Sequence, residues 1–103
     1  MVDFFMKIIT ICGSFKYIDD MKRISEKLCI EGNCVLSPLY PIDDKKYSDD
    51  DKIILGKMHL ERIRVSDSIL VLNIDNYIGE STKKEIEFAK SLGKEIVYYK
   101  DIN

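Results

Sequence analysis

Residues 69–73 read ILVLN, an unbroken run of four aliphatic side chains that ends in an asparagine. Asp67 and Ser68 punctuate the chain immediately before this run. A strand with one face in water alternates apolar and polar residues, whereas a strand covered on both faces is continuously apolar. The run therefore predicts a strand in the interior of a parallel sheet, with helices packed on both sides of it.

Similar apolar runs and helical patterns alternate on both sides of this segment. The other strand-like runs are KIITIC at 7–12, CVL at 34–36 and EIVYY at 95–99. Helical spacing of apolar residues is found over 16–31, 52–66 and 82–92. Gly32 and Gly93 stand where helix C-caps belong. The order βαβαβαβ predicts an α/β fold, a three-layer Rossmann-like or flavodoxin-like parallel sheet of four to five strands, in the order 2-1-3-4 with any fifth strand following.

The 103 residues fit a single domain, 1–103, with 46% hydrophobic residues available for its core. The segment 37–51 is the longest irregular stretch, and it is polar and acidic. Loops of this length are often functional or mobile, so we expect it either to lie over a binding site or to be a solvated excursion. The first five residues, MVDFF, read as a short extension that lacks the pattern of a signal peptide.

The composition argues against nucleic acid and membranes as partners. The net charge is −2, and no basic stripe marks a nucleic-acid surface. No apolar run approaches the roughly 20 residues of a membrane span, so we expect no membrane partner. Cys12, Cys29 and Cys34 form no C-x-x-C pair and read as small buried hydrophobes in a reducing cytoplasm. Cys12, beside the first loop, is the one candidate for a catalytic cysteine.

In a parallel α/β sheet, ligands bind beyond the carboxyl ends of the strands. Three loops leave those ends, at 13–15, 37–51 and 74–81, and we expect them to converge on one site. Gly13 and Ser14 open a helix whose backbone N–H groups suit an anion, unless Ser14 simply caps that helix. They do not form a dinucleotide-binding or Walker motif.

Glu85 has two possible roles in the first turn of the third predicted helix. Thr82 and Glu85 fit the capping box S/T-x-x-E, in which the glutamate bonds back to the N–H of the cap residue. A carboxylate at this place can also be a nucleophile if it faces a pocket with a second acid–base group. His59, the single histidine, lies on the second predicted helix and is either that group or an ordinary packed histidine.

Three stretches together resemble the nucleoside 2-deoxyribosyltransferase family, and more closely its compact relatives, the 2′-deoxynucleoside 5′-phosphate N-hydrolases. They are ITICGSF at 9–15, HLERIRVSDSILVLN at 59–73 and GESTKKEIEFAKSLGKEIVYY at 79–99. The resemblance implies that Glu85 is the catalytic nucleophile. His59 stands where the family has a catalytic aspartate. The substrate-binding residues implied by the resemblance are Gly13, Ser14, Phe15, Asp67, Gly79 and Ser81, with Gly79 at a position where the family commonly has an aspartate or serine.

The resemblance implies cleavage or transfer of the N-glycosidic bond of a nucleoside or deoxynucleoside, or of its 5′-monophosphate. Glu85 would attack C1′, and His59 would protonate or orient the leaving base, with an unperturbed pKa of about 6.5. No metal or redox cofactor is implied, and a homodimer or larger homo-oligomer is expected. The alternatives are a catalytically inactive module that binds or senses a nucleotide, and a purely structural domain.

Overall fold

The computed structural model describes residues 6–42 and 46–102. The predicted extension at 1–5 and the middle of the predicted 37–51 loop lie outside the described residues. The four strands are β1 (Ile8–Cys12), β2 (Cys34–Leu36), β3 (Ser68–Val71) and β4 (Glu95–Tyr98). They form one parallel sheet in the order β2-β1-β3-β4, which confirms the predicted fold class and strand order.

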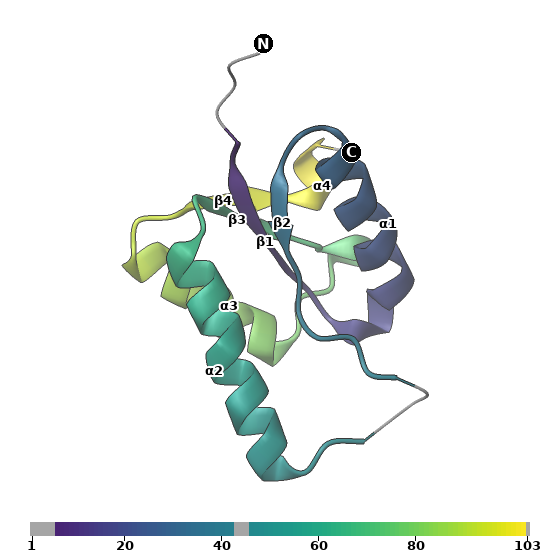
Figure 1. Cartoon of the computed structure of the whole chain (residues 1–103), viewed down its shortest axis with the longest axis vertical. Helices are drawn as coiled ribbons and strands as arrows, with labels where there is room; N and C mark the ends of the chain where they lie inside the picture. Colours follow the sequence, from purple (N-terminus) through teal and green to yellow (C-terminus); the bar gives the residue numbers. More distant parts are fainter. Residues whose placement is uncertain (1–5, 43–45, 103) are drawn as a thin grey trace.

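Three long helices cover the sheet and make a three-layer sandwich (Figure 1). They are α1 (Ile18–Ile30), α2 (Asp49–Val65) and α3 (Glu80–Ser91). Short helical turns also occur: η1 (Phe15–Tyr17), η2 (Ile74–Asn76) and α4 (Tyr99–Ile102). Helix α1 lies on one face of the sheet, and α2 and α3 lie on the other (Figure 1).

The run at 69–72 shows why both faces are apolar. Ile69 and Val71 pack in the core under α2 and α3, whereas Leu70 and Leu72 pack in the core under α1. All four side chains are at most 3% exposed. Because successive residues of a strand point to opposite faces, only a continuous apolar run can supply both cores.

The helix boundaries differ from the prediction where capping chemistry sets them. Helix α2 begins at Asp49 rather than 52, because the Ser48 hydroxyl accepts a hydrogen bond from the Asp51 N–H at 3.1 Å. The three aspartates that follow Ser48, read from the sequence as loop, lie in the first turn, where negative charge favours a helix. Gly32 and Gly93 follow their helices with positive φ angles of 99° and 70°, as the C-cap prediction requires.

Two other expectations are corrected by the structure. Cys29 is exposed on α1 and Cys34 is half-buried, so only Cys12 is the buried apolar cysteine expected of all three. The last strand ends at Tyr98, and Tyr99 begins α4. The carboxyl ends of β1, β3 and β4 therefore lie at Cys12, Val71 and Tyr98, along one edge of the sheet.

Candidate active site

A cavity of about 670 Å³ opens at the carboxyl edge of the sheet. This volume lies within the usual range of about 300–1,000 Å³ for small-molecule sites. Its lining comes from the first loop (Gly13, Ser14, Phe15), the segment between β2 and α2 (Pro38, Leu39, Pro41, Lys46, Tyr47), helix α2 (Lys52, Leu55, Gly56, His59, Arg62) and helix α3 (Ser81, Thr82, Glu85). The three predicted loops thus contribute to one cavity.

Six of the eight predicted site residues line this cavity: Gly13, Ser14, Phe15, His59, Ser81 and Glu85. Gly13 packs closely on Leu72, just beyond the end of β3, since a Cβ atom added at Gly13 would lie 3.1 Å from the Leu72 Cβ. The Ser14 hydroxyl caps η1 by accepting a hydrogen bond from the Lys16 N–H at 3.1 Å. The first loop is therefore fixed both by its packing on Leu72 and by its cap.

The remaining two predicted residues, Asp67 and Gly79, are not in the cavity lining that the described residues form. The Asp67 carboxylate accepts a hydrogen bond from the Ile8 N–H at 2.7 Å. Because Ile8 begins β1 and Asp67 precedes β3, this bond ties the strands together at the amino edge, opposite the cavity. Gly79 is the N-cap of α3 and faces the Tyr77 ring. The contact that the structure gives the Asp67 side chain is therefore one between strands.

The capping-box interpretation of Glu85 is wrong. Helix α3 begins at Glu80 after an N-cap at Gly79, so Thr82 is inside the helix and 3% exposed. Glu85 therefore lies in the second turn, one turn beyond the position from which a carboxylate could bond back to the cap. Its side chain, 19% exposed, instead points toward β1 and α2.

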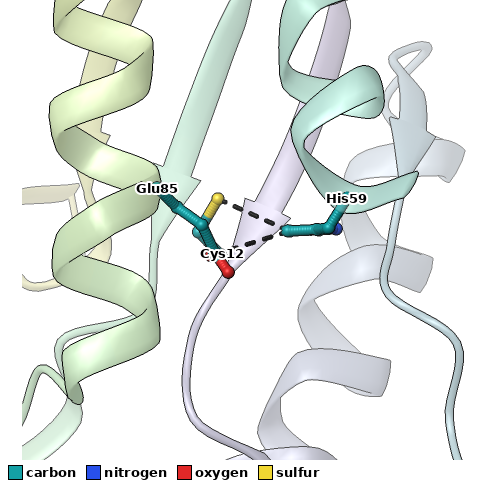
Figure 2. A group of neighbouring side chains, drawn as sticks. All are labelled: Cys12, His59 and Glu85. Atoms are coloured by element: carbon teal, nitrogen blue, oxygen red, sulfur yellow. Dashed lines mark hydrogen bonds and ion pairs between the residues drawn. The ribbon is translucent and has the colours of Figure 1, made fainter. Parts of the chain in front are cut away.

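Glu85, His59 and Cys12 form a compact cluster (Figure 2), in which His59 and Glu85 also line the cavity. They come from α3, α2 and the last residue of β1. The Nε2 atom of His59 lies 3.7 Å from the Sγ atom of Cys12 and 3.7 Å from Oε1 of Glu85. The other ring nitrogen, Nδ1, lies 3.2 Å from Nη1 of Arg62. Each end of the imidazole therefore has its own polar neighbours.

Burial shifts the protonation of all three side chains. Desolvation raises the pKa of Glu85 to about 7, and a hydrogen bond from the Cys12 thiol opposes this shift. Desolvation, reinforced by the positive charge of Arg62, lowers the pKa of His59 to about 4, while a hydrogen bond to the Ile11 backbone acts in the opposite direction. Burial raises the pKa of Cys12, and the Glu85 charge adds to the effect.

These shifts bear on the expected roles of two residues. With its pKa lowered to about 4 by burial, His59 is neutral at pH 7, a state in which the imidazole donates or accepts a hydrogen bond without carrying a charge. The raised pKa of Cys12 keeps its thiol protonated, whereas a nucleophilic cysteine needs a thiolate in an electropositive setting. Glu85 remains the group that can lose a proton near neutral pH.

The three side chains are also close enough together to bind a metal ion. Their thiol, imidazole and carboxylate atoms lie within 4.8 Å of one another. A metal ion on Nε2 would leave the ring proton on Nδ1, which usually donates to an acceptor. Here Nδ1 faces the Arg62 guanidinium, which only donates hydrogen bonds. The donor set therefore fits direct hydrogen bonding better than it fits a metal ion.

Several lining residues were not singled out from the sequence. Arg62 follows His59 by three residues, a spacing that brings helix side chains together, and this was the available signal. Lys46 and Lys52 lie in or beside the segment read as an acidic loop, and Gly56 lies in the middle of α2. A glycine inside a helix is itself a signal, because it costs about 1 kcal/mol relative to alanine.

Comparison of the sequence with family models and with curated proteins gives no match. Comparison of the structure gives matches. A 2-deoxyribosyltransferase from Bacillus psychrosaccharolyticus superposes with a TM-score of 0.68 at 21% identity, over 88% of this chain and 70% of that one. A 2-deoxyribosyltransferase from Leishmania mexicana gives 0.61 at 20% identity, over 90% and 63%. The fold is that of the 2-deoxyribosyltransferases.

A third similar structure, a conserved protein from Enterococcus faecalis V583, gives a TM-score of 0.64 at 20% identity over 91% of this chain and 63% of that one. The chain thus spans less than two thirds of two of these three proteins. The resemblance to the 2-deoxyribosyltransferase fold, expected from three short stretches of sequence, is confirmed at the level of the fold. No helix in the described part of the chain has both the length and the apolar character needed to cross a bilayer.

Proposed function

We propose that this protein cleaves or transfers the N-glycosidic bond of a nucleoside or deoxynucleoside, or of its 5′-monophosphate, with Glu85 as the nucleophile. One observation carries the proposal. The Glu85 carboxylate lies at a cavity of about 670 Å³, on the carboxyl edge of a 2-deoxyribosyltransferase fold, and is not used as a helix cap. Its pKa of about 7 is typical of a carboxyl group tuned for chemistry by burial.

In the proposed reaction, ionised Glu85 attacks C1′ of the sugar. A bond forms between its Oε atom and C1′, the C1′–N bond breaks, and the electron pair leaves with the base, which takes a proton from water. Water or a second base then attacks C1′ and releases Glu85, as in retaining glycoside hydrolysis. Because the transition state resembles an oxocarbenium ion, the carboxylate also stabilises the positive charge that develops on the sugar.

His59 acts in this scheme as a neutral hydrogen-bond donor. Its Nε2 atom lies 3.7 Å from Glu85, close enough for a small shift to complete a hydrogen bond when substrate is bound. The neutral imidazole orients the carboxylate and lines the cavity in which the leaving base would lie. Gly13, Ser14 and Ser81 supply backbone and hydroxyl groups for the sugar or a 5′-phosphate.

The charges around the cavity favour a phosphorylated substrate. Lys46, Lys52 and Arg62 contribute three positive charges to the described lining, in which Glu85 is the only acidic residue. A cavity with an excess of positive charge raises the local concentration of anionic ligands. We therefore infer that a nucleoside 5′-monophosphate is preferred over the free nucleoside.

The test is a panel of ribonucleosides, deoxynucleosides and their 5′-monophosphates, with release of free base followed by chromatography. Glu85→Ala and Glu85→Gln should abolish release. Glu87→Gln is a matched control, because Glu87 is an exposed carboxylate two residues away on the same helix. Base release that persists undiminished in Glu85→Ala would falsify the assignment. Tight binding without release by the unaltered protein would indicate a nucleotide-binding module instead.

We also propose that the protein is a homodimer in which α2 packs against its copy. Ile54, Met58 and Val65 recur on one side of α2 and are 57%, 49% and 46% exposed. The helix carries Asp49–Asp51 in its first turn and Arg62 and Arg64 in its last. Two copies packed antiparallel would therefore bury apolar side chains and set acidic ends beside basic ends.

A further inference from the structure

The contact between Arg62 and His59 decides where the imidazole carries its proton. Both residues lie on α2 one turn apart, and Nη1 of Arg62 lies 3.2 Å from Nδ1 of His59. A guanidinium group has donors and no acceptor, and it stays charged at all ordinary pH values. Nδ1 must therefore accept. Because a neutral imidazole has one donor and one acceptor nitrogen, the proton is on Nε2.

The protonated nitrogen points toward Glu85. Nε2 lies 3.7 Å from the Cys12 Sγ atom, within the longer range of hydrogen bonds to sulfur, and 3.7 Å from Oε1 of Glu85. The buried Cys12 thiol is protonated and donates to Glu85. The donors thus run in one direction: Arg62 to His59, His59 to Cys12, and Cys12 to Glu85.

We propose that Arg62 is a positioning residue that fixes the Nε2–H tautomer of His59 and thereby directs the hydrogen bonds of His59 and Cys12 toward the Glu85 carboxylate. The physical reason lies in the opposite tautomer. With the proton on Nδ1, the lone pair of Nε2 would face the oxygen of ionised Glu85, and two acceptors would confront each other in a buried site. Arg62 excludes that arrangement, because its own hydrogens occupy the position that an Nδ1 proton would need.

The groups that face His59 come from three elements. Glu85 faces it from α3, Cys12 and the Ile11 backbone from β1, and Arg62 from its own helix. Of these groups, Arg62 is the one that contacts Nδ1, at a distance of 3.2 Å. The inference concerns the free protein, so it stands independently of the reaction. Its consequence for rate rests on the proposed function of Glu85.

The chain has a single histidine, so nuclear magnetic resonance of its imidazole nitrogens reports on this site alone. In protein with ¹⁵N-labelled histidine, we expect long-range ¹H–¹⁵N spectra between pH 6 and 8 to show a protonated Nε2 and a bare Nδ1. In Arg62→Met, the Nδ1 signal should move toward the position of a protonated nitrogen. The pKa of His59 should also rise toward its ordinary value, because the positive charge is gone.

Arg64→Met is the matched control, because Arg64 lies two residues further on, is exposed and pairs with Glu61. It should leave the imidazole spectrum unchanged. A wild-type spectrum with the proton on Nδ1 overturns the proposal. So does an Arg62→Met spectrum that matches wild type while the amide spectrum shows an intact fold. If Arg62→Met does not fold, Arg62→Leu, which also lacks a donor, is judged by the same shift, and the wild-type spectrum still decides the tautomer.

The outcome of this experiment is separable from that of the base-release assay. The tautomer is measured without substrate, so a failure of the proposed reaction leaves it intact. If both proposals hold, Arg62→Met should lower kcat for base release while leaving KM for the free nucleoside near its wild-type value. A purely structural role for Arg62 would leave the imidazole shifts unmoved.

Discussion

The Nε2 atom of His59 and the Oε1 atom of Glu85 lie 3.7 Å apart, yet burial shifts the pKa values of both groups in the directions that favour their neutral forms. His59, with a pKa of about 4, is a cation only below that pH, and Glu85, with a pKa of about 7, is an anion only above that one. Between these values both are neutral. Desolvation causes both shifts, so the contact is a donor facing an acceptor rather than a salt bridge.

The pH dependence of base release should therefore follow Glu85 alone. Because the nucleophile must be ionised, kcat should rise as pH increases through about 7 and then level off. His59 stays neutral above a pH of about 4, so it should add no descending limb between pH 5 and 9. A bell-shaped profile, in which kcat falls again through a pKa near 6.5, would show instead that protonated His59 acts as a general acid.

Replacing Glu85 by glutamine should stabilise the folded protein at alkaline pH. The folded-state pKa of Glu85 is raised from 4.5 to about 7, so the stability of the wild type falls as pH rises through this interval. The shift of about 2.5 units corresponds to about 3 kcal/mol, at 1.36 kcal/mol per unit. Glutamine has nearly the same shape and no charge to desolvate. Glu85→Gln should therefore be more stable than wild type by about 3 kcal/mol at pH 8, and by under about 1 kcal/mol at pH 5.

Denaturant unfolding at the two pH values measures this difference. His59 titrates in the opposite sense: its lowered pKa contributes stability that is lost as pH falls from about 6.5 to about 4. That loss is common to both proteins and cancels in the comparison. Glu87→Gln, at an exposed carboxylate, should show no pH-dependent gain. Equal stability of Glu85→Gln and wild type at pH 8 would mean that the carboxylate is well solvated.

The two lysines of the cavity should act on the phosphate of the substrate. A hydrogen bond to a charged group contributes about 1.5 kcal/mol or more, so Lys46→Gln and Lys52→Gln should each lower kcat/KM for a 5′-monophosphate about tenfold. Their effect on the free nucleoside should be small. Lys57→Gln, on α2 but outside the described lining, is the control. Equal losses on both substrates would show that the lysines do not read the phosphate.

Two substitutions at Gly56 should affect the stability of α2 and the binding of nucleotide separately. Apart from its chain neighbours and the backbone of its own helix, no heavy atom of the described residues lies within 4 Å of a Cβ built at Gly56, which lines the cavity. Gly56→Ala should stabilise α2 by about 1 kcal/mol in denaturant unfolding. Gly56→Leu should fill part of the cavity and weaken nucleotide binding by calorimetry while the fold is kept. Lys57→Leu, at the neighbouring residue outside the described lining, should leave binding unchanged. If Gly56→Leu also binds nucleotide as tightly as wild type, the ligand does not bind beside Gly56.

The sequence predicts the sheet of this protein well because strand burial is a local pattern. The four residues 69–72 are continuously apolar, and the structure divides them alternately between the two cores. The starts of the helices are less predictable, because several residues compete to be the cap. Ser48 and Gly79 are the actual caps of α2 and α3, and the capping-box pattern at Thr82 is a coincidence of sequence inside a helix.

The candidate site was only partly predictable for a different reason. The sequence identifies Glu85 and His59 by their resemblance to family positions, but the protonation of each depends on burial and on neighbours from other elements. The pKa of His59 is lowered partly by Arg62, and Cys12 reaches the cluster from β1. The hydrogen bond that Asp67 accepts from the Ile8 N–H was likewise not predictable, because it joins residues 59 positions apart in the sequence.

The exposed side of α2 should govern the oligomeric state. A dimer of this 12.0 kDa chain has twice the mass of the monomer, which light scattering after size-exclusion chromatography resolves. Ile54→Glu combined with Met58→Glu should convert the dimer to monomer, because four carboxylates would be buried at a two-fold interface. Ile30→Glu, at an apolar residue of α1 that is 80% exposed, should leave the dimer intact. If the wild-type protein is monomeric at high micromolar concentration, α2 does not form a dimer interface. If Ile30→Glu abolishes the dimer, the interface lies on α1 instead.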